Sequence, residues 1–301
     1  MQSKVKLAIL LLIAANIIWG AAFPIYKLVL TQVPPFTFVF LRFFISALIL
    51  LPFVYKSLRI RTRDILTLVF LSIAGITLTI SFLNFGLKLS SSINAPIIIS
   101  SAPIFLIIGS FLFLKEKLNS KIIFGTIVSF FGVLVIVLMP AFEKGLDGSI
   151  RGNLFLVFAA LFSVAHALFL KKIISKYNPL TIVFWSFLVG SLPLIPFVLN
   201  EYNQINWATT LDIKIILGIV FSIIFATIIA HSIFAYGIKY IKASEIGIFS
   251  YVDPIAAILV AVPLLNEKIT APYLIGAFLV FGGIFVAEGR FHYHPLQKLK
   301  T

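Results

Sequence analysis

The stretch Leu114-Lys115-Glu116-Lys117-Leu118, which follows Pro103 and precedes Gly125, decides the fold because the chain contains it twice in similar form. The second copy stands 151 positions later as Pro254, Leu265-Asn266-Glu267-Lys268-Ile269 and Gly276. No residue is inserted or deleted between the paired positions. A spacing that is kept over this length indicates that one structural unit is used twice.

The earlier part of each unit repeats as well, with slightly shorter offsets. The matched pairs are Lys27 with Lys171 and Pro35 with Pro179, both 144 apart, and Asp64 with Asp212, 148 apart. The small differences in offset fall between hydrophobic segments, so the whole first half has a counterpart in the second. We predict two homologous units of five hydrophobic segments, residues 1–148 and 149–290, followed by a short cytoplasmic tail, residues 291–301.

The composition indicates a membrane protein. Hydrophobic residues make up 61% of the chain, charged residues 11%, and the mean hydropathy is +1.13, which lies outside the range of soluble domains. A helix needs about 20 apolar residues to cross a bilayer, and the apolar runs are continuous rather than alternating as in barrel strands. We predict an all-α integral membrane protein with ten transmembrane helices, at residues 7–30, 36–55, 65–87, 93–114, 122–139, 154–170, 180–199, 213–238, 246–265 and 273–287.

The distribution of Lys and Arg orients these helices, because basic loops are retained on the cytoplasmic side. With the N-terminus inside, 17 basic residues fall on the cytoplasmic side, 6 fall outside, and Arg42 lies within a span. Both termini then face the cytoplasm, and the two units cross the membrane in opposite directions. This topology, with contacts to anionic lipid headgroups, also explains the net charge of +14 without a nucleic-acid partner.

Two inverted units are the usual construction of a secondary transporter, in which a site near the membrane midplane opens first to one side and then to the other. We therefore predict a carrier whose partners are a small-molecule substrate and the lipid bilayer. A passive channel or facilitator is the alternative, since the same helices could build it. The sequence has no cysteine and no recognisable constellation of nucleophile or metal ligands, so we predict neither an enzyme nor a cofactor. The oligomeric state stays open, and a monomer is compatible with the sequence.

Several motifs also carry a family resemblance. They are Trp19-Gly20, Leu41-Arg42-Phe43, and the two matched segments from Pro103 to Gly125 and from Asp253-Pro254 to Gly276. In these motifs, the chain resembles the EamA family of the drug/metabolite transporter superfamily over essentially its whole length. The resemblance implies a ten-helix carrier of a prokaryotic inner membrane that exports amino acids or other small metabolites, with its site between the halves. The sixth predicted helix departs from the family pattern, because Ser163 and His166 stand where a tryptophan is often seen.

Two ionisable residues lie deep within predicted spans, where a charge is costly and marks a functional candidate. Arg42 is about 12 Å along the second helix and Asp253 about 15 Å along the ninth, at 1.5 Å per residue. Arg42 is a candidate to bind a substrate carboxylate, and the two side chains could pair across the site. Asp253 is a candidate to couple transport to protons. The alternatives are a purely structural ion pair and an arginine that extends outward along its own stem.

Pro103 and Pro254 fall inside predicted helices, where proline removes a hydrogen bond and leaves a carbonyl free. In a transporter such breaks can supply a hinge and acceptors for substrate, and Ser100 and Ser101 lie within one turn of Pro103. The alternative is a static kink that lets helices pack.

Further polar and aromatic residues of the spans complete the predicted substrate site, with ordinary helix packing as the alternative for each. They are Asn16, Trp19, Asn84, His166, His231, Tyr236 and Tyr251. Neither histidine has an acidic residue at the spacing used by helical metal sites, so we predict no metal.

Overall fold

The computed structural model describes residues 2–102, 105, 120–144, 148–205, 212–240 and 247–287, and all regular structure in those ranges is helical. The α-helices are α1 (Gln2–Val29), α2 (Pro35–Val54), α3 (Thr62–Ser72), α4 (Ser81–Leu89), α5 (Asn94–Ser100), α7 (Ser120–Lys144), α8 (Gly148–Ile173), α9 (Pro179–Ser191), α10 (Ile195–Glu201), α12 (Ile213–Phe221), α13 (Ala230–Tyr240), α15 (Asp253–Leu265) and α16 (Ala271–Ala287). Pro103 and Glu116 lie outside the described residues.

Six helical segments of the described chain are long and apolar enough to cross a membrane. They are Lys4–Val29, Pro35–Ser57, Thr62–Leu89, Ser149–Lys176, Pro179–Glu201 and Ile213–Tyr240. Three shorter apolar helices are Ile123–Leu138, Phe249–Leu265 and Ala271–Val286. The prediction of a helical membrane protein is therefore confirmed.

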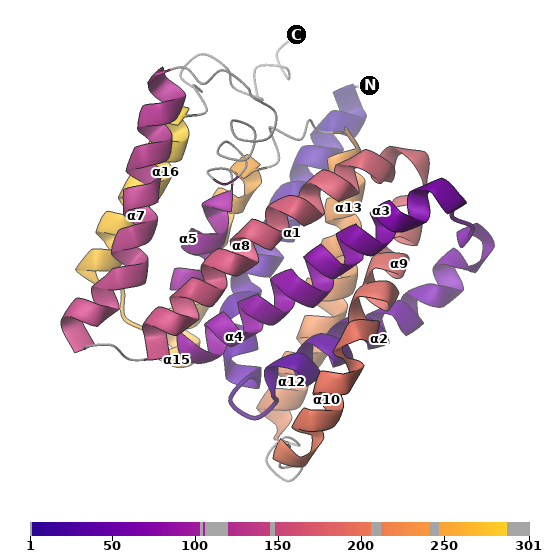
Figure 1. Cartoon of the computed structure of the whole chain (residues 1–301), viewed down its shortest axis with the longest axis horizontal. Helices are drawn as coiled ribbons and strands as arrows, with labels where there is room; N and C mark the ends of the chain where they lie inside the picture. The colour runs from indigo at the N-terminus through magenta and orange to yellow at the C-terminus, as the bar shows by residue number, and fades with distance from the viewer. Residues whose placement is uncertain are drawn as a thin grey trace.

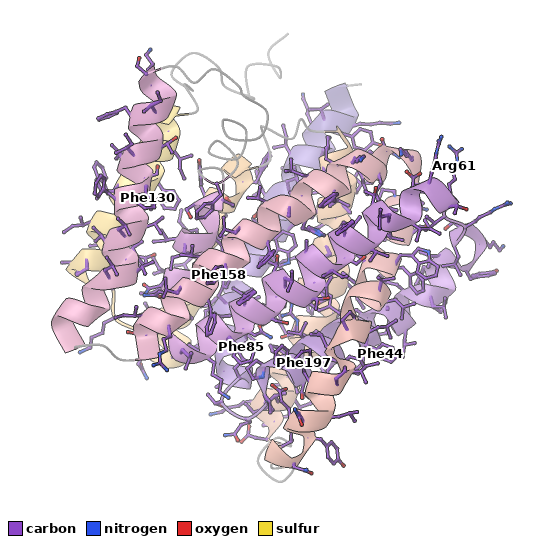
Figure 2. The ribbon with its side chains drawn as sticks, viewed as in Figure 1. Phe44, Arg61, Phe85, Phe130, Phe158 and Phe197 are labelled. Carbon is purple, nitrogen blue, oxygen red and sulfur yellow. The ribbon has the colours of Figure 1, made fainter. Side chains whose placement is uncertain are left out.

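Large apolar side chains cover the outside of the bundle. Phe130 on α7 and Phe158 on α8 are 47% and 46% exposed and lie among the side chains that cover these helices in Figure 2. Apolar exposure on this scale is unfavourable in water and favourable against lipid tails. The inside of the bundle is mainly apolar as well, with buried polar side chains such as Arg42, Asn84 and Asp253 among the apolar ones.

Two segments contain a π-helical stretch in their middle, Ile73–Ile80 between α3 and α4, and Ser222–Ile229 between α12 and α13. In each stretch a threonine, Thr79 or Thr227, donates its hydroxyl proton to the carbonyl oxygen five residues earlier, over 2.7 Å. Such wide turns in a helix are uncommon and frequently occur at functional sites. The two halves thus share the same irregularity at corresponding places.

Prolines begin α2 and α9, where the missing N–H would have no partner in any case. At α9, the side chain of Asn178 accepts a hydrogen bond from a backbone N–H of the first turn. At α2, the acceptor comes from the other half, because Glu201 at the end of α10 accepts from the backbone N–H and the hydroxyl of Thr37, at 2.7 and 2.9 Å. Glu201 of the second half therefore caps the N-terminus of α2 in the first half.

Helices of each half pack against helices of the other half. Helix α1 lies against α13 and α15, and α8 lies correspondingly against α4 and α5. Helix α2 packs on α9, and α7 packs along α16, a pair that stands at one side of the molecule in Figure 1. Glycines allow the α7–α16 contact, since a Cβ added at Gly132 would come within 2.6 Å of the backbone nitrogen of Val280.

The ninth predicted helix differs from expectation at Pro254. Residues Gly247–Val252 form a 3-10 helix, and α15 begins at Asp253, so that Pro254 lies in the first turn of α15. The proline therefore lies at the change from 3-10 to α-helix within the apolar segment Phe249–Leu265, and its missing N–H leaves no α15 carbonyl without a donor. The sequence predicts a break in the helix at Pro254. The structure has a change of helix type there instead, because the 3-10 helix ends at Val252 and α15 begins at Asp253.

Candidate functional site

Arg42 lies at the centre of the contact between the two halves. Its side chain extends from α2, and the residue is 1% exposed. Nη2 donates a hydrogen bond to the hydroxyl oxygen of Tyr26 on α1, at 2.6 Å. Nε and Nη2 also donate to the hydroxyl oxygen of Thr227, each at 3.3 Å, and Thr227 belongs to the second π-helical stretch. Arg42 thereby connects two helices of the first half to one of the second.

Aromatic rings enclose the guanidinium group. Its carbon Cζ is 3.9 Å from the ring centroid of Tyr26, 5.2 Å from that of Phe43 and 5.3 Å from that of Phe38. Ring faces attract a cation, more strongly where water is excluded. They stabilise the charge of Arg42 without neutralising it.

The charge of Arg42 has no anionic partner among the described residues. The ion pairs found there join Lys27 to Glu267 and Lys176 to Asp64, so the predicted pairing of Arg42 with Asp253 is wrong. Nη1 of Arg42 also has no hydrogen-bond partner within the described part of the chain. A buried cation with an unused donor is unfavourable unless an anion reaches it, and guanidinium groups suit carboxylates.

His231 connects Arg42 to an aromatic cluster. Its ring centroid is 5.0 Å from that of Trp19, 5.3 Å from that of Phe187 and 5.6 Å from that of Phe43. Its Nδ1 lies 3.1 Å from the carbonyl oxygens of residues 226 and 227. Because carbonyl oxygens only accept, Nδ1 carries the proton, and Nε2 of the neutral ring is left as an acceptor.

A cavity of about 20 Å³ lies beside His231. Its lining residues are Ile76, His166, Leu170, Ile182, Val183, Ser186, Phe187, His231, Phe234 and Ala235. Nδ1 of His166 is 2.9 Å from the carbonyl oxygen of Leu71, so this nitrogen is also a donor. The space holds about one water molecule. A metabolite can therefore reach this region only when helices move apart.

Asp253 lies at the contact of α15 with α1, next to this cluster. The residue is 4% exposed, and its Oδ1 has no hydrogen-bond partner among the described residues. A Cβ added at Gly20 would collide with the backbone of Asp253. The neighbouring Trp19 donates through Nε1 to the carbonyl oxygen of Ala226, at 2.9 Å. One turn of α1 therefore contacts both the Arg42 cluster and Asp253.

Several other predicted residues are used by the fold itself. The side chains of Asn16, Asn84, Ser100 and Ser101 donate to the backbone carbonyl oxygens of Leu12, Pro35, Ser250 and Ile98. The rings of Tyr236 and Tyr251 lie against those of Tyr240 and Phe281, at centroid distances of 5.1 and 5.3 Å. None of these six lines the cavity beside His231. The structure therefore brings together Trp19, Arg42, His166 and His231 from the predicted set.

Sequence reasoning missed four residues of this region: Tyr26, Ser186, Phe187 and Thr227. Ser186 could have been found, because it stands 144 positions after Arg42 and is therefore its counterpart in the repeat. Thr227 becomes conspicuous only once the π-helical stretch is known. Nothing in the sequence separates Tyr26 from the tyrosines that are common at membrane interfaces.

The model of the EamA-like transporter family matches the chain twice, at residues 6–138 and 150–288. An uncharacterized transporter of Archaeoglobus fulgidus is 30% identical over 89% of this chain and 94% of its own length. A probable amino-acid metabolite efflux pump of Escherichia coli is 29% identical, over 90% of this chain and 91% of its own. A solved crystal structure superposes with a TM-score of 0.64 at 19% identity, covering 93% of this chain and 96% of that one, which shows a shared fold.

The chain belongs to the EamA-like transporter family, and the predicted resemblance is confirmed. It is a multi-pass membrane protein of a family of transporters, not an enzyme.

Proposed function

We propose that this protein is a secondary transporter that exports carboxylate-bearing small metabolites, amino acids among them, across a prokaryotic inner membrane. The substrate carboxylate binds Nη1 of Arg42, and Trp19, His231 and Phe187 enclose the remainder of the molecule. The observation that carries this proposal is a buried guanidinium group with an unused donor at the contact between the halves. The name of the Escherichia coli relative supports the substrate class.

The proposed mechanism is alternating access by two inverted five-helix units. Its supports are the double match to the family model, the π-helical stretch in each half and the packing of helices of each half against helices of the other. Units of five helices must cross the membrane in opposite directions, since five is odd. The small volume beside His231 fits a state in which a metabolite has no room there until the helices move.

Reporter fusions test the inverted topology. A reporter placed after Tyr55, Leu170 or Ala287 should be cytoplasmic, and one placed after Met139 or Leu199 should be outside. A cytoplasmic signal at Met139 together with an outside signal at Ala287 would contradict five helices per unit and two cytoplasmic termini.

Binding and flux measurements test the transport function. Purified protein is first screened by thermal shift against amino acids, their amides and their methyl esters, because only the free acids offer Arg42 a carboxylate. Metabolites that raise the melting temperature are then used as radiolabelled substrates in proteoliposomes. Saturation, competition and counterflow indicate a carrier, whereas flux that stays linear with concentration and shows no counterflow indicates the alternative, a passive pore.

Protons are the proposed coupling ion, with Asp253 as the group that carries them. A buried carboxylate without a partner is costly when charged and is relieved by a proton. The backbone of Asp253 lies against Gly20, next to Trp19, so a movement of Trp19 on substrate binding would be passed to the residue that bears this carboxyl group. Transport against an imposed pH gradient tests the coupling.

A further inference from the structure

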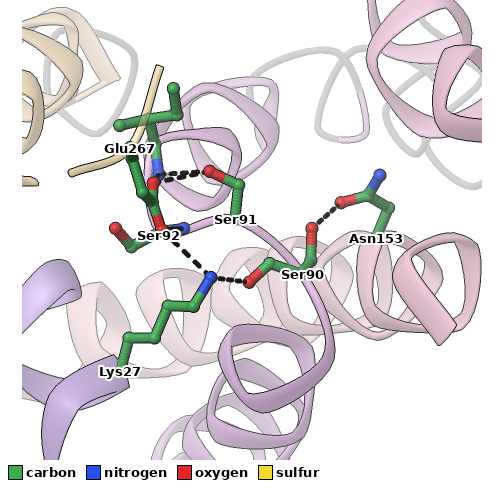
Figure 3. A network of polar contacts seen from close by, with 7 residues as sticks. Lys27, Ser90, Ser91, Ser92, Asn153 and Glu267 are labelled. Atoms are coloured by element: carbon green, nitrogen blue, oxygen red, sulfur yellow. Dashed lines mark hydrogen bonds and ion pairs between the residues drawn. The ribbon is translucent and has the colours of Figure 1, made fainter. Parts of the chain in front are cut away.

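Glu267, in the connection between α15 and α16, is the centre of a polar network (Figure 3). Its Oε1 lies 3.0 Å from Nζ of Lys27 and accepts the backbone N–H of Ser92 at 2.9 Å. Its Oε2 accepts the hydroxyl proton of Ser91 at 2.6 Å and the backbone N–H of Ile93 at 3.1 Å. One carboxylate of the second half thus binds the end of α1 and the turn between α4 and α5.

A second set of contacts extends from the same turn to α7 and α8. Lys27 donates to the carbonyl oxygen of Ser90, at 2.5 Å, and the hydroxyl of Ser90 donates to Oδ1 of Asn153, at 2.5 Å. Asn153 in turn donates through Nδ2 to the carbonyl oxygen of Ile136, at 3.1 Å. The turn at residues 90–92 is therefore held on both sides (Figure 3).

This network lies near one end of the bundle, away from the cavity. Asn153 is near the beginning of α8, and Leu170, which lines the cavity, is near its end. At 1.5 Å per residue these two positions are about 25 Å apart along the helix. The network thus closes the end of the bundle that is farther from the cavity.

The contacts in this network are of a kind that can be broken reversibly. The side chains of Lys27 and Glu267 are 29% and 12% exposed, so water can replace their hydrogen bonds when the segments separate. Burial alone would raise the pKa of the Glu267 carboxyl. Hydrogen bonds from Ser91 and Ser92 and the charge of Lys27 outweigh burial and hold the pKa below its ordinary value, so the carboxylate is charged at neutral pH. The α7–α16 contact is different, because helix backbones pack directly on each other there and the described residues make no side-chain ion pair that water could replace.

We infer that Lys27, Glu267 and the Ser90–Ser92 turn form a latch that closes one mouth of the transport path and must break when that mouth opens. The inference rests on the proposed alternating access, and it assigns the closing of one face to a single carboxylate. Because four donors converge on Glu267, loss of its charge weakens these four contacts together.

A single buried thiol can report the opening of the latch. The chain has no cysteine. Ser92 is 0% exposed, and its hydroxyl has no hydrogen-bond partner among the described residues, so Ser92→Cys leaves the latch contacts in place. The measurement is the rate of alkylation by a maleimide, on the full-length protein purified in detergent. This format requires neither a known substrate nor a known orientation.

We expect Glu267→Gln to accelerate alkylation of Ser92→Cys by about tenfold, because charge-assisted hydrogen bonds of this kind shift a two-state equilibrium by about that factor. Lys27→Met should act in the same direction from the other side of the pair. Lys176→Met is the matched control, since it removes the other ion pair, with Asp64, which lies away from the Ser90–Ser92 turn, and should leave the rate unchanged.

A second reporter separates opening from unfolding. Ser129 is 0% exposed between α7 and α16, so Ser129→Cys should stay unreactive when only the latch opens. The latch is overturned if Glu267→Gln and Lys27→Met leave alkylation of Ser92→Cys unchanged, or if they accelerate both reporters equally. Faster alkylation at Ser92→Cys alone supports the latch. Failure to find any transported metabolite would count against the proposed transport function and not against the latch.

Discussion

Arg42 and Glu267 are both charged side chains that join the two halves, but their surroundings differ. Glu267 has Lys27 and three hydrogen-bond donors around its carboxylate. Arg42 is more deeply buried, and it has two hydroxyl groups, three aromatic rings and an unused Nη1. The charge that is satisfied lies at the end of the bundle, and the unsatisfied one lies at its centre.

The difference separates a contact that holds the protein together from a site that awaits a ligand. A fully paired charge gains nothing from a substrate, so Glu267 is suited to closing a mouth. A buried cation without an anion gains a great deal from one, so Arg42 is suited to binding. The predictions below test this contrast.

Loss of the Arg42 charge should have the largest effect. Arg42→Gln should abolish transport of carboxylate substrates, because no other Lys or Arg side chain of the described residues lies in this cluster. Arg42→Lys keeps the charge but replaces the planar donor group, and we expect KM to rise by about tenfold or more. Uptake by proteoliposomes that contain equal amounts of folded protein measures both.

The control for Arg42 is a basic residue that is already paired. Lys176→Met breaks the Asp64 pair and should leave KM unchanged. Correctly inserted Arg42→Lys protein with wild-type kinetics would show that Arg42 is structural, and the contrast with Glu267 would then disappear.

Asp253 should control coupling rather than binding. Asp253→Asn resembles the protonated carboxyl group, so it should keep substrate binding and exchange while losing accumulation driven by a pH gradient. The measurement compares uptake by proteoliposomes with and without an imposed gradient. If the wild type ignores the gradient, or if Asp253→Asn still follows it fully, Asp253 is not the coupling group.

Packing between α7 and α16 gives a third test, because backbone atoms of the two helices come close together there. At Gly132 a Cβ would meet backbone atoms of α16, at 2.6 Å from N of Val280 and 2.8 Å from O of Gly276. Gly132→Ala should therefore destabilise the protein by about 1–3 kcal/mol. Gly282→Ala is the matched control, since a Cβ there has nothing within 4 Å. Thermal unfolding in detergent should separate the two, and equal melting temperatures would contradict the contact.

The smallest expected effect is that of pH on the latch. The pKa of Glu267 is lowered in the folded protein, so the stabilisation is fully present above the ordinary glutamate pKa of about 4.3. It is lost as the pH falls through the lowered value. Lys27 is the charged group that faces Glu267 in the described structure.

Modification of the Ser92→Cys thiol by disulfide exchange should therefore stay slow from neutral pH down to the ordinary glutamate range and increase below it. A dipyridyl disulfide reagent, which reacts with thiols in acid, measures this, with Ser129→Cys as the control for acid unfolding. Opening that begins well above the glutamate range would contradict the lowered pKa.

Much of the fold could be predicted from particular residues. The apolar runs in the described ranges are helical, and six of these segments are long enough to cross a membrane, because continuous apolar runs leave few alternatives in lipid. Pro254 shows the limit, since its sequence does not distinguish a break inside a helix from the first turn of a new one. The π-helical stretches were equally invisible, because a wide turn depends on what packs against it.

The candidate site was predictable in part. Arg42, Trp19, His166 and His231 were found because polar and bulky groups are conspicuous in apolar helices. Their partners were not, since Tyr26, Thr227 and Phe187 approach Arg42 or His231 from helices that are distant in the sequence. The expected pairing of Arg42 with Asp253 failed for the same reason, because depth along two helices does not say which faces meet.

By itself the sequence determined the membrane class, the doubled unit and the presence of a deep cation, because hydropathy, spacing and charge are properties of the chain alone. Only the tertiary structure decided that Glu267 is satisfied and that Arg42 is not. Whether a charge finds a partner depends on how helices from the two halves rotate and approach. That is fixed by packing over the whole bundle and by no single segment.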